Sequence, residues 1–127
     1  MILLDADFLI AYFRENDQQH NRAVEIMKSV NETTFVTTSI INEIFTYIKA
    51  RDGGKKTREV WEWIKNSDIE IIEINRIIEE IIYYVEKFDG LSFGDASNIA
   101  IMKQLGIERI VSFDSDFDII PGIRRIY

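Results

Sequence analysis

The chain alternates between two kinds of hydrophobic pattern. Short apolar or β-branched runs, such as Ile2-Leu3-Leu4, are typical of buried strands. The longer segments between them carry apolar residues every three or four positions, which predicts amphipathic helices. The runs place strands at 2–4, 33–37, 69–74, 110–112 and 123–127. The periodic segments place helices at 8–13, 17–30, 39–52, 55–66, 75–88 and 92–105, with Asp7, Ser39 and Ser92 expected at the starts of the first, third and last.

Strands that alternate with helices predict the α/β class, with a mainly parallel sheet covered by helices. The dipeptide Gly53-Gly54 predicts a break between two of the helices. No repeat, low-complexity stretch or linker divides the 127 residues, so we expect one domain spanning residues 1–127.

Composition narrows the chemistry that this domain can perform. The chain has no cysteine, which excludes disulfides, cysteine nucleophiles and thiolate zinc sites. Its one histidine, His20, excludes sites with several histidines, and we assign it no catalytic role. The 22 acidic residues outnumber the 15 basic ones, giving a net charge of −7. This balance argues against a protein that holds nucleic acid by bulk charge alone.

The sequence also bears on location. No apolar run approaches the ~18 residues of a membrane-spanning helix. The apolar N-terminus lacks the basic region of a signal peptide, and Asp5 and Asp7 interrupt its apolar run at once. We therefore expect a cytoplasmic protein with no membrane partner.

Five carboxylates fall where an α/β sheet binds its ligands, beyond the carboxyl ends of the strands. Asp5 ends the first strand, Asp114 and Asp116 follow the fourth, and Glu43 and Asp95 lie in the first turns of two helices. Carboxylates that converge repel one another unless a cation lies among them. An oxygen-only set favours Mg²⁺ or Mn²⁺ over zinc.

Each acid also has a purely structural explanation. Asp5 suits a turn after a strand, and Asp95 suits a capping box with Ser92. Asp114 and Asp116 suit a solvated turn, and Glu43 can share a solvent-exposed edge of its helix. The residues alone leave these explanations open, but the joint placement of all five favours a site.

Five segments together resemble the PIN-domain family, and specifically the toxin ribonucleases of the VapC type. They are Leu3-Leu4-Asp5-Ala6-Asp7-Phe8-Leu9-Ile10, His20 with Arg22 and Ala23, Thr37-Thr38-Ser39-Ile40-Ile41-Asn42-Glu43, Leu91-Ser92-Phe93-Gly94-Asp95-Ala96 and Ile110-Val111-Ser112-Phe113-Asp114-Ser115-Asp116-Phe117. The chain departs from the family at Asp7, where asparagine, serine or threonine is usual, and at Ser112, where threonine is usual. The resemblance implies a three-layer α/β/α sandwich whose central, mainly parallel sheet has four to five strands.

The same resemblance implies an activity and partners. It implies a Mg²⁺- or Mn²⁺-dependent endoribonuclease, the toxin of a type II toxin–antitoxin pair, with an RNA substrate, a cognate antitoxin and a homodimeric state. By this resemblance Asp5, Asp95 and Asp114 hold the metal. Glu43 binds it through water or a second metal, or orients the attacking water, and Asp116 supports the site together with Ser112.

Two alternative functions remain from the sequence. A PIN-like module without activity would serve in binding or assembly. A phosphatase would use Asp5 as its nucleophile, because Asp5-Ala-Asp7 after an apolar strand resembles the motif of haloacid-dehalogenase-like enzymes.

Two surface features are candidates for contacts. A basic cluster surrounds the Gly53-Gly54 break and is either an RNA-phosphate contact or a solubilising helix end. Its members are Lys49, Arg51, Lys55, Lys56 and Arg58. Trp61 and Trp63, two residues apart, cannot share one face of a helix, so at least one is expected to be exposed or covered by a partner. Tyr83 and Tyr84 are further interface candidates.

Overall fold

Five short strands form one sheet in the computed structural model, which describes residues 1–127. All neighbouring strands are parallel, in the order β3-β2-β1-β4-β5. The strands are β1 (Ile2–Leu4), β2 (Thr34–Thr37), β3 (Glu70–Ile72), β4 (Arg109–Val111) and β5 (Arg124–Ile126). The predicted parallel sheet is therefore confirmed, although the third strand is shorter than the range 69–74.

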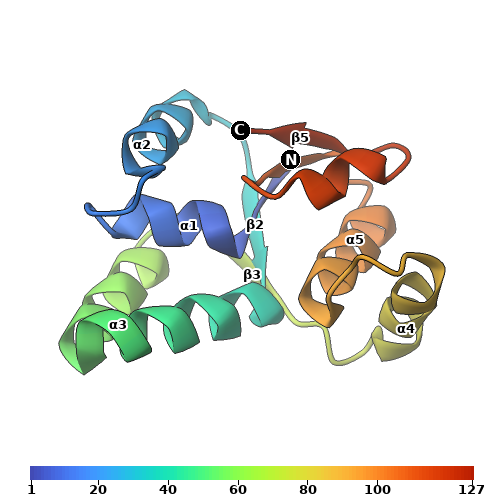
Figure 1. Ribbon diagram of the computed structural model, residues 1–127, viewed down its shortest axis with the longest axis horizontal. Helices are drawn as coiled ribbons and strands as arrows, with labels where there is room; N and C mark the ends of the chain where they lie inside the picture. The colour runs from blue at the N-terminus through green and yellow to red at the C-terminus, as the bar shows by residue number, and fades with distance from the viewer.

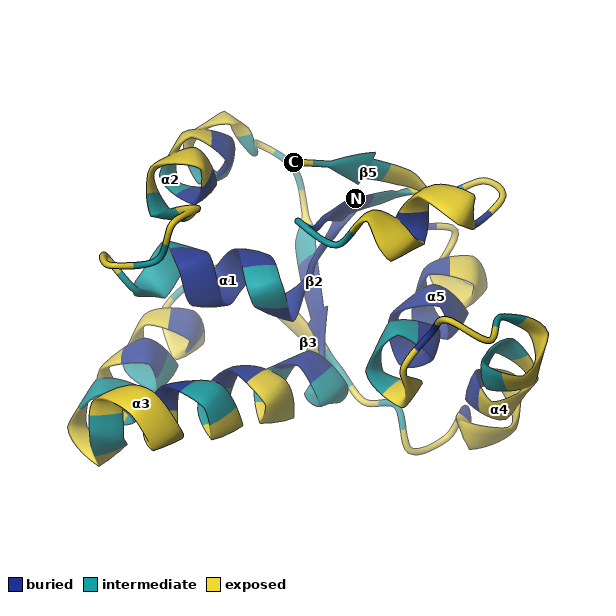
Figure 2. Ribbon diagram, viewed as in Figure 1, coloured by how far each residue is buried: buried dark blue, intermediate teal, exposed yellow.

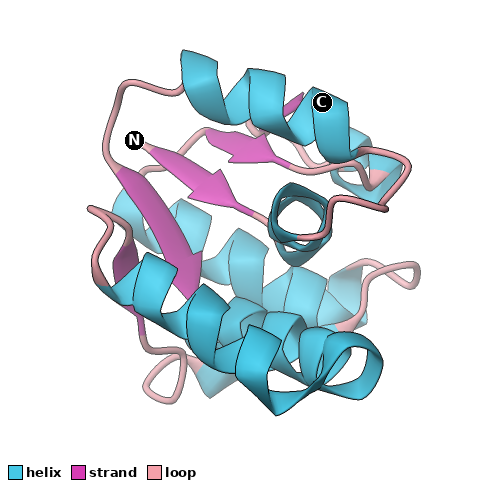
Figure 3. Ribbon diagram, turned by 90° about the vertical axis from the view of Figure 1, so that its left-hand side faces the viewer, coloured by secondary structure: helices cyan, strands magenta, loops and turns pink.

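The helices form a layer on each side of this sheet (Figures 1 and 3). They are α1 (Ala6–Phe13), α2 (His20–Ser29), α3 (Thr38–Lys65), α4 (Ile78–Lys87), α5 (Phe93–Leu105) and a short 3₁₀ helix, η1 (Ser115–Ile119). Helices α1, α2 and α3 lie on one side, and α4 and α5 on the other. The chain adds β2 and β3 toward one edge of the sheet and then β4 and β5 toward the other edge. Because crossovers between parallel strands are right-handed, this reversal of direction places the two groups of helices on opposite faces. The three-layer α/β/α prediction is confirmed.

The central strand lies in the middle of the core (Figure 2). Every residue of β1 is buried, as a strand covered on both faces requires. Helix α5 is buried continuously from Ala96 to Met102. Polar residues on these two elements must therefore find partners inside the protein.

Two of the expected helix caps are wrong. Asp5, not Asp7, caps α1, because its side chain accepts a hydrogen bond from the Ala6 N–H. Thr37, not Ser39, caps α3, and its hydroxyl accepts from the Ile40 N–H. In both places the chain passes almost directly from strand to helix, which moves the cap toward the strand. Ser92 is confirmed as the cap of α5.

Helix boundaries also differ from the predicted ranges. Helix α2 begins at His20 instead of 17, and α4 begins at Ile78 instead of 75. Gly53 has φ 88° and ψ 177°, a conformation open only to glycine, and it kinks α3 into two arms. The predicted break is therefore a kink within one long element. No helix is both long and apolar enough to cross a membrane.

Candidate active site

The acidic residues gather at the carboxyl ends of the neighbouring strands β1 and β4. Strand order changes direction here, since β2 follows β1 on one side and β4 lies on the other. Ligands of parallel α/β sheets bind in the crevice at such a switch point. Asp5 follows β1, and Ser112 and Asp114 follow β4. The first turn of α5 brings Asp95 to the same end.

Asp5 lies at the bottom of this crevice, only 6% exposed. Its Oδ1 accepts hydrogen bonds from the Ala6 N–H at 2.8 Å and from Asn98 Nδ2 at 3.1 Å. Its Oδ2 accepts from the Ser112 hydroxyl at 2.7 Å. Donors from β4 and α5 thus fix the carboxylate in one orientation.

Asn98 is a site residue that the sequence reasoning missed. It is 2% exposed, and its Oδ1 accepts a hydrogen bond from the Thr37 hydroxyl at 3.3 Å while its Nδ2 donates to Asp5. It therefore links the ends of β2 and β1 through one side chain. The available signal was a strongly polar residue three positions after Asp95 in the apolar stretch of α5, on the same helix face.

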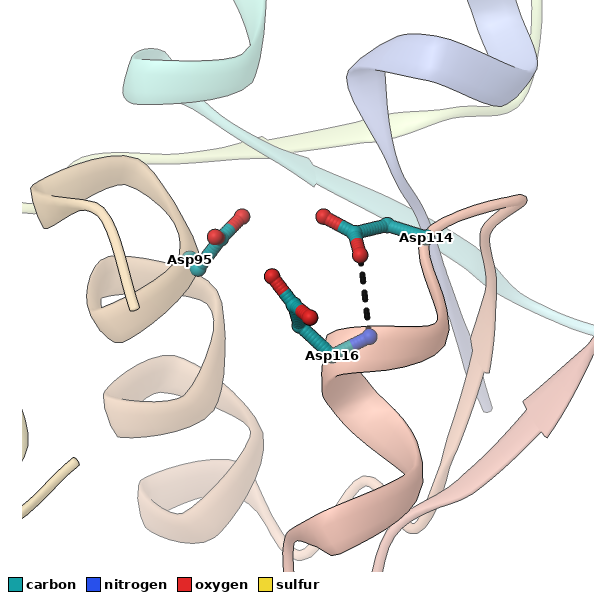
Figure 4. Close-up of side chains that lie close together, drawn as sticks. All are labelled: Asp95, Asp114 and Asp116. Carbon is teal, nitrogen blue, oxygen red and sulfur yellow. Dashed lines mark hydrogen bonds between the residues drawn. The ribbon is translucent and has the colours of Figure 1, made fainter. Parts of the chain in front are cut away.

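Asp95, Asp114 and Asp116 form the closest group of carboxylates (Figure 4). One oxygen from each lies within 4.8 Å of the others. Asp95 is held by the capping box with Ser92, whose hydroxyl accepts from the Asp95 N–H at 3.1 Å. Asp114 caps η1 by accepting from the Asp116 N–H at 2.9 Å, as the dashed line in Figure 4 marks. The capping explanation of Asp95 is correct, and the same residue still faces the other two acids.

Asp7 and Glu43 complete the acidic surroundings. Asp7 Oδ2 accepts a hydrogen bond from the Phe113 N–H at 3.1 Å, so it ties α1 to the segment that carries Asp114. Glu43 lies on the exposed side of α3 beside Asn42, as its structural explanation predicts. Its carboxylate also faces the first turn of α5, where a Cβ built on Gly94 would lie 3.9 Å from Glu43 Oε2.

Burial and mutual repulsion raise the pKa of four of these acids. Burial, followed by the Asp7 carboxylate, raises the pKa of Asp5 to about 8. Burial is also the main cause of the raised pKa of Asp7, with Asp114 adding to it. The pKa of Glu43 is raised by partial desolvation and then by Asp95 and Asp7.

The pKa of Asp95 is also raised, and no basic side chain is paired with any acid of the site. Burial raises the pKa of Asp95, and the charges of Asp114 and Asp116 raise it further. None of the six acids forms an ion pair with a basic side chain. The site therefore concentrates negative charge that no ion pair within the protein compensates.

This donor set fits a hard divalent cation. Asp95, Asp114 and Asp116 offer carboxylate oxygens only, which suits Mg²⁺ or Mn²⁺. Asp116, expected only to support the site, is thus a member of the candidate metal group, whereas Asp5, expected to be a ligand, is not in this group and its oxygens accept hydrogen bonds from the protein. His20 is elsewhere, with its Nδ1 2.8 Å from the Ala11 carbonyl oxygen.

Comparison with known proteins identifies the class that this fold and site define. The family model described as the PIN domain matches residues 2–123. The chain therefore belongs to the PIN-domain family.

Individual relatives in this family are VapC proteins. The chain is 28% identical to "Ribonuclease VapC13" of Mycobacterium tuberculosis, with 99% of each chain covered. The structure of VapC20 from the same species, titled a sarcin-ricin loop cleaving toxin, superposes with a TM-score of 0.86 at 21% identity over 93% of each chain. A toxin–antitoxin complex from Klebsiella pneumoniae gives a TM-score of 0.75 at 20% identity, covering 98% of this chain and 96% of that one.

Proposed function

We propose that the protein is a Mg²⁺- or Mn²⁺-dependent endoribonuclease, the toxin of a toxin–antitoxin pair. The observation that carries this proposal is the set of uncompensated carboxylates at the switch point, three of which converge within 4.8 Å. The curated relatives named as VapC ribonucleases supply the substrate class, RNA. RNA phosphodiesters are anionic, so a cation at this site would offset the repulsion between the carboxylates and the phosphate to be cleaved.

The proposed roles follow from where each side chain lies. Asp95 and Asp114 would hold the metal together with Asp116, and Asp5, at the end of β1, would supply a further carboxylate oxygen. When bound, the cation lowers the pKa of a coordinated water and neutralises charge on the phosphate. Glu43, which faces the first turn of α5, would orient the attacking water. Asn98 and Ser112 hold the Asp5 carboxylate in place.

Metal removal tests this function directly. Purified protein, free of any bound partner, is expected to cleave single-stranded RNA in Mn²⁺ or Mg²⁺ and to stop when EDTA is added. Gel analysis of a labelled oligoribonucleotide measures the cleavage, and adding Mn²⁺ in excess of EDTA is expected to restore it. Protein that binds Mn²⁺ without cutting any RNA would instead support the inactive-module alternative.

We further propose that an antitoxin binds the protein and that the chain self-associates in the cytoplasm. The solved neighbour from Klebsiella pneumoniae is a toxin–antitoxin complex, which supports binding of an antitoxin.

An apolar surface on α4 supports self-association. Ile78 and Ile82, one turn apart on this helix, are 43% and 41% exposed. Light scattering is expected to give a dimer for the wild type and a monomer for Ile82→Glu; a wild-type monomer would contradict it.

The phosphatase alternative is disfavoured by the family match. The PIN-domain model covers residues 2–123, which include the Asp5-Ala-Asp7 segment on which that alternative depends.

A further inference from the structure

A pocket on α3 leads away from the acidic site toward the basic cluster. It has a volume of about 560 Å³, and its lining includes Glu43, Tyr47 and Arg51 on α3 and Ser92 and Gly94 at the start of α5. Glu43, Tyr47 and Arg51 follow one another at four-residue spacing, so they lie along one face of the helix. Eight residues of helical rise separate Glu43 from Arg51 by about 12 Å. One pocket therefore has the Glu43 carboxylate, which faces the first turn of α5, near one end and the Arg51 cation at the other.

The Arg51 guanidinium stacks on an aromatic ring and forms no ion pair. Its central carbon lies 3.9 Å from the centroid of the Tyr47 ring, a close stacking contact. Tyr47 is itself contacted at 5.3 Å by Arg14, which is paired with Asp52 at 2.7 Å. Arg51 takes part in no ion pair. Stacking on a ring leaves the N–H edges of a guanidinium free to donate to an anion.

Three other members of the basic cluster line other pockets or are paired. Lys49 lines a different pocket with Phe45 and Thr57, and Lys56 lines one with Asp52 and Arg14. Arg58 is paired with Glu62. Arg51 is the one basic residue among those that line the Glu43 pocket. Within this pocket, Arg51 is therefore the cation that can contact an RNA phosphate.

We propose that this pocket is a binding subsite for the RNA backbone, in which Arg51 contacts a phosphate next to the segment being cleaved. The inference rests on the proposed ribonuclease function and specifies how its substrate is held. A strand that places one phosphate at the acidic site must run past other acids of a chain with net charge −7. A guanidinium that stacks on Tyr47 and is carried about 12 Å further along the helix axis offsets that repulsion for a neighbouring phosphate. Ser39, Asn42, Thr46 and Ser92 add hydroxyl and amide groups to the lining of the same pocket.

RNA binding in EDTA tests the subsite without cleavage. Fluorescence anisotropy of a labelled single-stranded oligoribonucleotide, repeated over a range of salt concentrations, gives the Kd and its salt dependence. We expect Arg51→Ala to raise the Kd about tenfold. The slope of log K against log salt is expected to become shallower by about 0.7, the value for one phosphate contact on a single strand.

Two further variants control for charge and folding. Arg58→Ala removes an exposed arginine from the same helix, and it is expected to leave the Kd unchanged because Arg58 is already paired. Arg51→Lys is expected to keep the salt slope and recover part of the affinity, because it keeps the charge but loses the planar stacking group. Alanine is the best helix former, so Arg51→Ala should fold, as a thermal unfolding scan would verify.

The possible results distinguish the Arg51 subsite from the proposed ribonuclease function. Equal Kd and salt slope for wild type and Arg51→Ala would overturn the subsite, even if the protein cleaves RNA. A wild type with no detectable binding at low salt would overturn it as well. Binding that depends on Arg51 in a protein that never cleaves RNA would support the subsite and reject the nuclease.

Discussion

Replacing Asp95 by asparagine is expected to lower the rate of metal-dependent RNA cleavage by at least about 100-fold, as loss of one electrostatic group from an active site typically does. Asp95 contributes an oxygen to the group with Asp114 and Asp116. An amide keeps the shape of the side chain but removes the charge that attracts a cation. Its oxygen can still accept from the Ser92 N–H, the hydrogen bond that Asp95 makes at 3.3 Å, so α5 should remain capped. Single-turnover cleavage in Mn²⁺ measures the loss.

The matched control for this prediction is Asp89→Asn. Asp89 is exposed in the turn before α5 and makes no side-chain hydrogen bond, so the same chemical change there should leave cleavage at the wild-type rate. Calorimetric titration with Mn²⁺ supplies a second readout, in which Asp95→Asn should bind more weakly than wild type. Full cleavage by Asp95→Asn would remove Asp95 from the proposed catalytic group.

The general position of the site could be predicted because it depends on short-range patterns and one topological rule. Runs such as Ile2-Leu3-Leu4 mark their strand in any context, since a central parallel strand is buried on both faces. Asp5 and Asp114 follow two such runs, and parallel strands bring their carboxyl ends to one edge. Asp95 could be placed because a capping box with Ser92 is a local signal.

Other features of the site depend on contacts between distant segments of the chain, which no local sequence pattern predicts. Whether Asp5 or Asp7 caps α1 is decided by Phe113, whose N–H engages Asp7 from a segment more than 100 residues away. Asn98 could be predicted to be polar and on the inner side of α5, but its partners Thr37 and Asp5 come from two other elements. The stacking of Arg51 on Tyr47, by contrast, joins residues four positions apart on one helix, a spacing that could have separated Arg51 from the neighbouring lysines.

The buried acids of the site lower the stability of the metal-free protein when they ionise, so the free energy of unfolding should depend on pH. Asp5 is more often protonated in the folded protein than in the unfolded chain, because burial raises its pKa from 3.8 to about 8. A folded state that holds more protons loses stability as pH rises between those two values. Asp7, Glu43 and Asp95 shift in the same direction. Without metal, the protein should therefore be more stable in mild acid than at neutral pH.

We expect the free energy of unfolding in EDTA to fall by about 2 kcal/mol from about pH 5.5 to about pH 7.5, because one excess bound proton is worth about 1.4 kcal/mol per pH unit. Asp5→Asn should remove most of this slope and make the metal-free protein more stable than wild type at the higher pH. The amide cannot ionise, and its oxygen can still accept from Ala6 and Asn98. Urea unfolding at the two pH values measures both effects.

Asp89→Asn again serves as the control, and it should keep the full slope of the wild type because it leaves the buried acid untouched. Adding Mn²⁺ at the higher pH should stabilise the wild type, since a cation favours the ionised carboxylates, and should stabilise Asp5→Asn less. A wild type whose stability in EDTA rises over this pH range would mean that Asp5 is already ionised in the folded protein. The same slope in wild type and Asp5→Asn would assign the effect to Asp7, Glu43 or Asp95 instead.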